Sequence, residues 1–212
     1  MVFTVSDFKM LFQHWSDIMQ TNKDYLIEID SVVGDADLGL TMSKGFKTAS
    51  DTIQEKDESD IGKLAYYAGK AMSTAVPSTM GTLISQGFMT AGKALRGKQE
   101  LMDADIAVFF QEFYNGVQKL GEAKPGEKTI LDGMTTTLQL LNESTTNKTP
   151  IEEIAAKLIP AADSDLQATR DMVAKHGRAA TRGEASRSLL DPGAVVAKLL
   201  ISEFAEFVMS KK

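Results

Sequence analysis

The residues best suited to chemistry are three aspartates that fall within eight positions, Asp30, Asp35 and Asp37, with Gly34 and Gly39 beside the last two. Carboxylate oxygens are the hard ligands that Mg²⁺ or Ca²⁺ prefers. Gathering three anions without a cation is electrostatically costly. Because Mg²⁺ usually takes few protein ligands and completes its shell with water and phosphate, the segment predicts a metal–nucleotide site. The same spacing also suits a simpler alternative, in which Asp30 and Asp37 cap two successive helices.

Two known motifs are excluded by residue type. An EF-hand counted from Asp35 would need Gly at loop position six and Glu at position twelve, where this chain has Leu40 and Phe46. The segment from Gly87 to Lys93 has the glycine–lysine spacing of a phosphate-binding P-loop. Ala94, however, stands where a Ser or Thr must reach the magnesium, and no strand precedes the segment. We therefore predict neither motif.

Two further loops precede helices and offer exposed amides. Val76–Thr82 mixes small and hydroxyl residues, and the free N–H groups at a helix start suit a phosphate. Capping by Ser78 or Thr79 is the alternative, and the two roles are compatible. Gly121–Thr129 is a Gly/Pro loop in which Thr129 is placed to cap a helix that begins near position 130. Both loops are candidates for contact with a nucleotide.

A fourth loop, His176–Gly193, combines a basic residue with a helix start. Arg178 could pair with phosphate through two N–H groups, or it could be an exposed solubilising charge. Asp191 followed by Pro192 is typical of a helix start, with the aspartate as cap. The sequence shows no Ser/His/Asp nucleophilic grouping, since its two histidines, His14 and His176, lie in separate segments.

Helices must position these loops, because apolar residues recur at spacings of three and four along most of the chain. Ser6 is placed to cap the first helix. The best strand candidate, Ile29–Val33, is short. We therefore predict an all-α, up-and-down antiparallel bundle or barrel of about eight helices, with the nucleotide site in the loops at one end. The expected helices span 6–20, 23–31, 38–55, 60–75, 81–96, 104–121, 130–143, 150–175 and 192–210.

The composition narrows the class of protein. The 212 residues are 43% hydrophobic and 25% charged, which predicts a single globular domain over 1–212. The lack of cysteine excludes disulfides, cysteine-based zinc sites and thiol catalysis. A net charge of −6 argues against nucleic acid or an anionic membrane as partner. No apolar run approaches the roughly 20 residues of a membrane span, and the N-terminus lacks signal-peptide features. We expect a cytoplasmic protein.

Taken together, the four loops resemble the ADP-binding L subunit of phosphotransferase-system-dependent dihydroxyacetone kinases, and the match runs nearly the full length. The residues that carry the resemblance are Asp30, Gly34-Asp35-Ala36-Asp37-Leu38-Gly39, Gly81, Gly121 through Thr129, Gly177-Arg178-Ala179, Gly183-Glu184 and Asp191-Pro192-Gly193.

The resemblance implies a barrel of antiparallel helices with a nucleotide held at one rim. It implies that Asp30, Asp35 and Asp37 bind two Mg²⁺ ions, which neutralise phosphate charge during phosphoryl transfer. No catalytic residue beyond these ligands is expected on this chain. The positions that correspond to the family's contacts with ADP or ATP are Leu38, Thr41, Thr79, Met80, Gly81, Gly121, Thr129, Ile130, Arg178, Asp191, Pro192 and Gly193.

The resemblance also implies partners. ADP would stay bound and be rephosphorylated by a phosphohistidine on an M-type subunit, and the phosphoryl group would pass to a short ketose such as dihydroxyacetone on a K-type subunit. A homodimer is left open. Leu38 and Thr41 stand where the family usually has His and Asn, and the turn at Pro77–Thr82 also differs. These differences favour two alternatives: a regulatory nucleotide-binding module that has lost transfer, or an ATP-using subunit for another substrate, such as a tetrose or a fatty acid.

Overall fold

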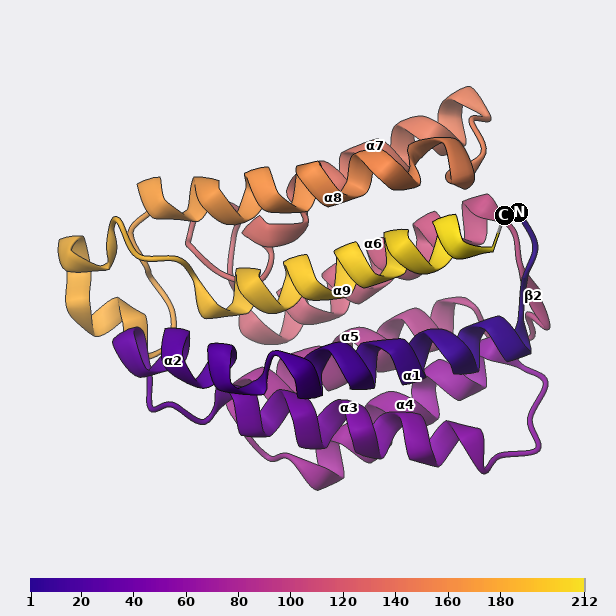
Figure 1. Ribbon diagram of the computed structural model, residues 1–212, viewed down its shortest axis with the longest axis horizontal. Coiled ribbons are helices and arrows are strands. Elements are labelled where there is room, and N and C mark those ends of the chain that lie inside the picture. Colours follow the sequence, from indigo (N-terminus) through magenta and orange to yellow (C-terminus); the bar gives the residue numbers. More distant parts are fainter. Residues whose placement is uncertain (212) are drawn as a thin grey trace.

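The computed structural model describes residues 1–211, and nearly all of them lie in helices (Figure 1). Two short strands, β1 (Phe3–Thr4) and β2 (Glu100–Leu101), pair antiparallel. The helices are α1 (Val5–Thr21), α2 (Lys23–Val33), α3 (Leu38–Gln54), α4 (Ile61–Ala75), α5 (Thr79–Ala94), α6 (Asp103–Gly121), α7 (Thr135–Asn147), α8 (Ile151–Ala168) and α9 (Pro192–Ser210), with short 3₁₀ helices η1 (Asp132–Met134), η2 (Thr169–Asp171) and η3 (Arg178–Ser186).

Eight of these helices close into a ring of antiparallel neighbours. In the described residues, α1 packs on α3, each helix from α3 to α9 packs on the next, and α9 returns to α1. Helix α2 continues the direction of α1 and packs mainly on α3 (Figure 1). The predicted all-α, up-and-down architecture of about eight helices is therefore confirmed.

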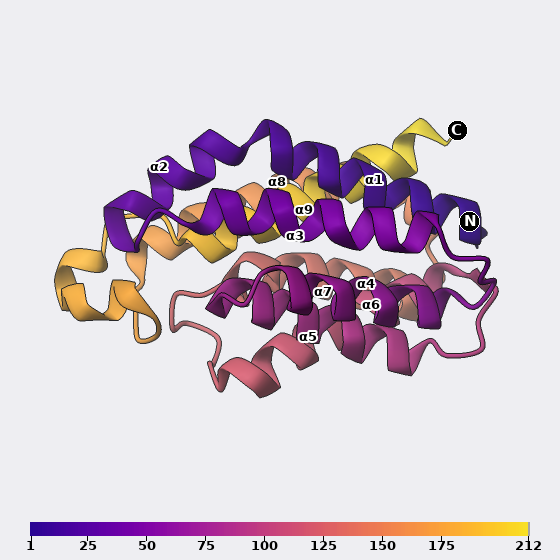
Figure 2. The same ribbon diagram turned by 90° about the horizontal axis from the view of Figure 1, so that it is seen from below.

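The up-and-down order sorts the connections between the two ends of the ring. Because neighbouring helices run in opposite directions, every second connection returns to the same end (Figures 1 and 2). One end holds the connections 34–37, 76–78, 122–134 and 169–191. The other holds 55–60, 95–102 and 148–150, together with Met1 and the end of α9. All four loops with candidate chemistry thus meet at one end, which we call the loop end.

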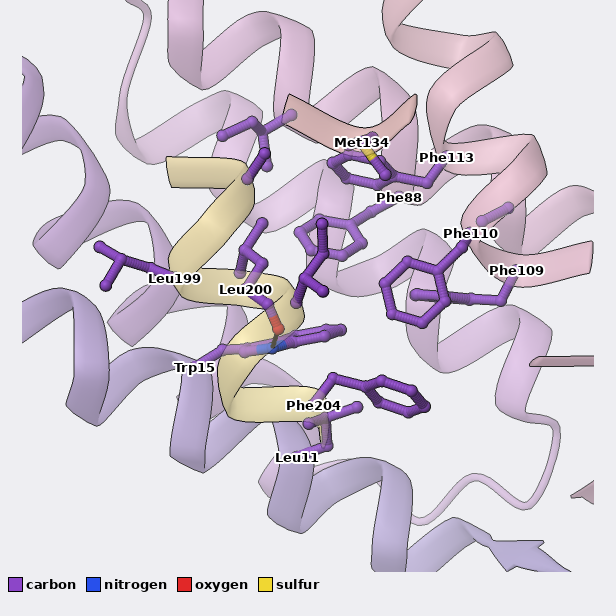
Figure 3. Packing of buried hydrophobic residues seen from close by; sticks show 14 of the residues in the cluster. Leu11, Trp15, Phe88, Phe109, Phe110, Phe113, Met134, Leu199, Leu200 and Phe204 are labelled. Carbon is purple, nitrogen blue, oxygen red and sulfur yellow. Dashed lines mark hydrogen bonds between the residues drawn. The ribbon is translucent and has the colours of Figure 1, made fainter. Parts of the chain in front are cut away.

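Aromatic side chains fill the interior of the ring (Figure 3). The ring of Phe88 lies 5.0 Å from that of Phe12 and 5.0 Å from that of Phe113, and 5.7 Å from the indole of Trp15. The indole N–H of Trp15 donates to the carbonyl of Leu200 at 3.0 Å, so its one polar atom is satisfied inside the core. These contacts make the barrel a packed scaffold that holds the loop end rigidly.

Two details near the N-terminus bear on the prediction. Ile29–Val33, the best strand candidate, is the last part of α2 and forms no strand, in agreement with the predicted all-α class. The cap of α1 is Thr4 in place of Ser6. The Thr4 hydroxyl accepts the amide of Asp7 at 3.3 Å, and the Asp7 carboxylate accepts the amide of Thr4 at 2.8 Å.

Two helix boundaries beside the loop end also differ from the prediction. The helix expected from position 130 begins at Thr135, because the Asp132 carboxylate ties the preceding segment into a turn. The helix expected to reach position 175 ends at Ala168, where the chain continues as η2 and the carbonyl of Thr169 turns toward the side chain of Lys128. Among residues 1–211, every helix is too short or too polar to cross a lipid bilayer.

Candidate functional site

The three aspartates of the first loop come together in space. Asp30 lies in the last turn of α2, and Asp35 and Asp37 lie in the connection to α3. One carboxylate oxygen from each falls within 4.8 Å of the others. We call these three residues the aspartate cluster. An all-oxygen, triply acidic donor set suits a hard divalent cation such as Mg²⁺.

Hydrogen bonds explain how the chain holds Asp30 in the cluster. Its Oδ2 accepts the amides of Asp37 at 3.1 Å and Leu38 at 3.3 Å, so Asp30 caps α3 from the preceding helix. Asp37 occupies the cap position itself but makes no side-chain cap bond. A Cβ on Gly34 would lie 2.1 Å from Oδ1 of Asp30, so glycine at this position leaves the Asp30 carboxylate in its place in the cluster. The simpler alternative, in which Asp30 ends α2 and Asp37 caps α3, is therefore wrong in both parts, because Asp30 caps the start of α3 with one oxygen and Asp37 makes no cap bond.

The cluster is short of positive charge. Partial burial, followed by the carboxylates of Asp35 and Asp30, raises the pKa of Asp37 above its ordinary value. The one cation close to the cluster in the described residues is Arg178, whose Nη2 lies 2.7 Å from Oδ2 of Asp35. Both side chains of this pair are well exposed, at 69% for Arg178 and 42% for Asp35. The arrangement favours a further cation.

The second loop has the geometry of a capped helix start. The Ser78 hydroxyl accepts the amide of Gly81 at 3.1 Å, which confirms Ser78 as the cap. In the described residues the amides of Thr79 and Met80 have no acceptor, as is usual in a first helical turn. A Cβ on Gly81 would lie 2.5 Å from the carbonyl oxygen of Val76, so this glycine serves the tight turn. Two of the three predicted phosphate contacts thus offer a free amide.

The remaining loops meet the second one at the start of α9. A Cβ on Gly193 would lie 2.9 Å from Cε of Met80 and 3.0 Å from the amide nitrogen of Ile130. Residues of the second, third and fourth loops therefore touch at one point. Gly121, at the end of α6, lies against α5, since its Cβ would lie 3.1 Å from the Leu83 side chain of that helix.

Asp191 and Pro192 begin α9 as predicted. The Asp191 carboxylate accepts the amide of Ala194 at 2.7 Å, and Pro192 occupies the first turn. Burial raises the pKa of Asp191 to about 7. Thr129 caps locally, since its hydroxyl accepts the amide of Leu131 at 3.2 Å.

Two predicted positions face the interior. Leu38 is 3% exposed and Thr41 is 7% exposed, and Leu38 belongs to the hydrophobic core of the barrel. Their side chains are not on the surface that the other predicted nucleotide contacts share. At Leu38, it is the amide that faces the cluster, through its hydrogen bond to Asp30.

Three charged side chains that the sequence analysis did not single out are buried at the loop end. Lys128 is 2% exposed, Asp132 is 4% exposed and Asp165 is 8% exposed. Asp132 accepts the amides of Gly126 and Thr129 at 2.6 and 2.8 Å. Lys128 and Asp165 have other charged or polar residues as sequence neighbours, whereas Asp132 lies between Leu131 and Gly133; in each case the hydrogen-bond partners are seen only in the structure.

His176 also has a defined partner. Its Nε2 lies 2.6 Å from Oε2 of Glu127 and, with the amide of Lys124, lowers the pKa of Glu127 to about 2. The amide of Lys175 donates to the carbonyl of Glu127 at 3.2 Å. The third and fourth loops are therefore joined at the surface as well as at the start of α9.

Comparisons with known proteins agree with the geometry. Residues 32–206 match the family described as the DAK2 domain. The chain is 30% identical to the ADP-binding subunit DhaL of a PEP-dependent dihydroxyacetone kinase of Escherichia coli, over 89% of this chain and 90% of that protein. It is 31% identical to the DhaL subunit of dihydroxyacetone kinase 1 of Listeria innocua, over 86% of each chain.

A solved structure shares the fold. The dihydroxyacetone kinase from C. freundii, in complex with AMP-PNP and Mg²⁺, superposes with a TM-score of 0.67 at 18% identity. The alignment covers 93% of this chain and 33% of that one, so the similarity concerns one part of the larger enzyme.

Proposed function

The chain belongs to the DAK2 domain family, and on that premise we propose that it is the ADP-binding subunit of a dihydroxyacetone kinase. Its class is that of the phosphotransferases, as one subunit of a complex. The observation that carries the proposal is the aspartate cluster, whose oxygens lie within 4.8 Å of one another at the end where all four candidate loops meet.

The residues present suit a bound metal ion. Asp30, Asp35 and Asp37 would hold Mg²⁺, and partial burial together with the carboxylates of Asp35 and Asp30 raises the pKa of Asp37, which a bound cation would offset. We propose two ions, as the family resemblance implies. Bound Mg²⁺ would neutralise the charge of the phosphate oxygens, which is its usual contribution to phosphoryl transfer. The aspartates themselves would hold the metal ion in a fixed position at the rim of the barrel.

The nucleotide would lie across the loops next to the cluster. The free amides of Thr79 and Met80 suit a phosphate, since helix N-termini bind anions. Arg178 would move from Asp35 to a phosphate oxygen, where its planar guanidinium can make two hydrogen bonds. The remaining proposed contacts, some of which act through the backbone, are Leu38, Thr41, Gly81, Gly121, Thr129, Ile130, Asp191, Pro192 and Gly193.

The acceptor and the phosphodonor belong to other chains in this proposal. A K-type subunit would bring the ketose to the rim, and an M-type subunit would rephosphorylate ADP from a phosphohistidine. The names of the relatives from Escherichia coli and Listeria innocua, which are subunits of PEP-dependent kinases, support this division of labour. The role of this chain would be to position the phosphate by electrostatics, with no covalent intermediate on its own residues.

One observation favours a second candidate, a regulatory nucleotide-binding module without transfer. In the second loop the amide of Gly81 is already bonded to Ser78, and Leu38 and Thr41 face the core. Mixing the chain with K-type partners, short ketoses and a phosphodonor separates the two. Formation of the ketose phosphate supports the kinase subunit, and nucleotide binding without product supports the regulatory module.

Titration calorimetry with ADP, with and without Mg²⁺, tests the proposed site. Asp35→Asn should abolish Mg²⁺-dependent retention of ADP while the helical circular dichroism stays unchanged, because the substitution removes one negative charge from an exposed loop. Asp51→Asn is the matched control, since Asp51 is an exposed aspartate of α3 that pairs with Lys47. Equal ADP binding by Asp35→Asn and the wild type would show that the metal assignment is wrong.

A further inference from the structure

The ammonium group of Lys128 is buried at the loop end and fully hydrogen-bonded. A lysine carries three N–H donors and no acceptor. Nζ of Lys128 donates to three backbone carbonyls, those of Thr169 at 2.5 Å, Leu189 at 2.6 Å and Met172 at 3.3 Å. The side chain is 2% exposed, so these bonds replace its hydration.

The three carbonyls bracket the fourth loop. Thr169 and Met172 lie where the chain leaves α8, and Leu189 lies two residues before the cap of α9. One ammonium group therefore joins the two ends of the segment between α8 and α9. Asp191 lies near enough to act on the charge of Lys128, and burial lowers the pKa of the lysine. The segment between the bracketing carbonyls carries Arg178, the partner of Asp35.

The backbone of Lys128 is fixed as firmly as its side chain. Its φ of +63° lies in the left-handed region, which a residue with a side chain adopts only where its surroundings hold it there. The Asp132 carboxylate stabilises this conformation of Lys128, because it accepts the amides of Gly126 before the lysine and Thr129 after it. This conformation sends the lysine side chain inward and leaves Thr129 and Ile130 next to the start of α9.

We propose that Lys128 is a positioning residue, which fixes the third loop to the fourth so that Thr129 and Ile130 keep their place beside Asp191, Pro192 and Gly193. The inference rests on the proposed function, because those residues are the proposed contacts of ADP. In this inference, Lys128 touches neither nucleotide nor metal. It sets the distance between the third loop and the start of α9, which together form the proposed nucleotide-binding surface. It also predicts that the nucleotide and the metal cluster respond differently when the lysine is changed.

The first test measures hydrogen–deuterium exchange of the full chain without nucleotide. In Lys128→Met, amides of residues 172–190 should exchange at least about tenfold faster, the change expected when charged hydrogen bonds are lost. Amides of α1 and α3 and the fluorescence of Trp15 should not change. Lys124→Met is the matched control, since Lys124 is an exposed lysine of the same loop. Unchanged exchange over 172–190 would overturn the proposal.

The second test separates positioning from general support of the fold. Calorimetry should show that Lys128→Met binds ADP with Mg²⁺ about tenfold more weakly, or about 1.4 kcal/mol, while its affinity for Mg²⁺ alone does not fall. Equal loss of both affinities, or loss of neither, would contradict a positioning role. If the wild type itself binds no ADP, the proposed function fails, and the exchange result alone decides whether Lys128 holds the loops together.

A more conservative variant covers the case in which Lys128→Met does not fold. Lys128→Gln keeps amide donors near the same carbonyls, and it should show smaller changes in exchange and in ADP affinity than the methionine variant. If both variants fail to fold, Lys128 supports the whole barrel, and the proposal of local positioning is wrong.

Discussion

Arg178 and Asp35 form an ion pair over the aspartate cluster, with Nη2 of the arginine 2.7 Å from Oδ2 of the aspartate. The two residues come from η3 and from the connection between α2 and α3, so the pair joins the fourth loop to the first. An ion pair this exposed contributes little to stability. Its position is better explained by the negative charge of the cluster, which attracts the guanidinium as it would attract a metal ion.

Removing this guanidinium should therefore separate metal binding from nucleotide binding. Arg178→Gln should raise the affinity for Mg²⁺ alone by about 1.4- to fivefold, because an exposed competing charge is worth ~0.2–1 kcal/mol. The same variant should weaken binding of ADP with Mg²⁺, since a phosphate contact is lost. Calorimetry with each ligand measures both effects, and Arg182→Gln, on an exposed arginine of the same segment, is the control. A fall in both affinities would rule out competition between Arg178 and the metal.

The tight contact between Gly34 and Asp30 provides a second test of the cluster. In Gly34→Ala the new Cβ would lie 2.1 Å from Oδ1 of Asp30, so the carboxylate must turn away. We expect Mg²⁺ binding to weaken at least about tenfold, because one ligand of the set is displaced. Ala36→Gly, in the same connection, changes no cluster contact and should keep the metal. Wild-type Mg²⁺ affinity in Gly34→Ala would show that Asp30 does not bind the ion.

The buried Asp191 predicts a dependence of stability on pH. Its pKa is raised to about 7 in the folded chain from an ordinary value of 3.8. Between about pH 4 and pH 7 the folded chain keeps this proton while the unfolded chain has lost it, so the Asp191 contribution to the free energy of unfolding falls as pH rises. Asp191→Asn stays neutral and can still cap α9. Its stability relative to the wild type should therefore rise by about 2–4 kcal/mol over this range.

Urea unfolding at several pH values checks this prediction. The difference between the two proteins should grow up to about pH 7 and then level off, because above that pH the wild-type carboxylate is ionised in both states. Parallel curves for the wild type and Asp191→Asn from pH 4 to pH 8 would contradict it.

A substitution in the aromatic core should lower the stability of the fold without changing binding at the candidate site. Phe88→Ala should lower the free energy of unfolding by about 3–5 kcal/mol, because the ring is buried against Phe12, Trp15 and Phe113 and its removal leaves a cavity. Binding of ADP with Mg²⁺ by the folded protein should be unchanged. Val108→Ala, on an exposed side chain of α6, should cost well under 1 kcal/mol. Denaturant titration and calorimetry give the two quantities independently.

The fold could be predicted because helical periodicity is a local property of the sequence. Phe8, Leu11, Phe12 and Trp15 have the spacing of one buried face of a helix, and α1 buries them as that face. The prediction failed where distant partners decide. The helix expected to reach position 175 stops at Ala168, where the Thr169 carbonyl bonds to Lys128.

How the candidate residues come together could be predicted where they are close in sequence, and less well where they are not. Asp30, Asp35 and Asp37 are close in sequence, so their meeting required only a turn between two helices. The clustering of Met80, Ile130 and Gly193 could be anticipated only from the family resemblance, because three separate loops supply them. Lys128 has nothing in its sequence neighbourhood that marks it as buried, because its partners are carbonyls far along the chain. Asp132 has apolar neighbours, but the backbone amides that it accepts cannot be identified from the sequence.

The alternation of connections between the two ends of the ring has a practical consequence for labelling. The links 55–60, 95–102 and 148–150 are separated from the aspartates by the length of a helix, about 22 Å for 15 residues. Because the chain has no native thiol, a single cysteine introduced into one of these links would react with a dye at one known place. A fluorophore attached there would leave the loop end, where the proposed nucleotide and partner subunit would bind, unobstructed.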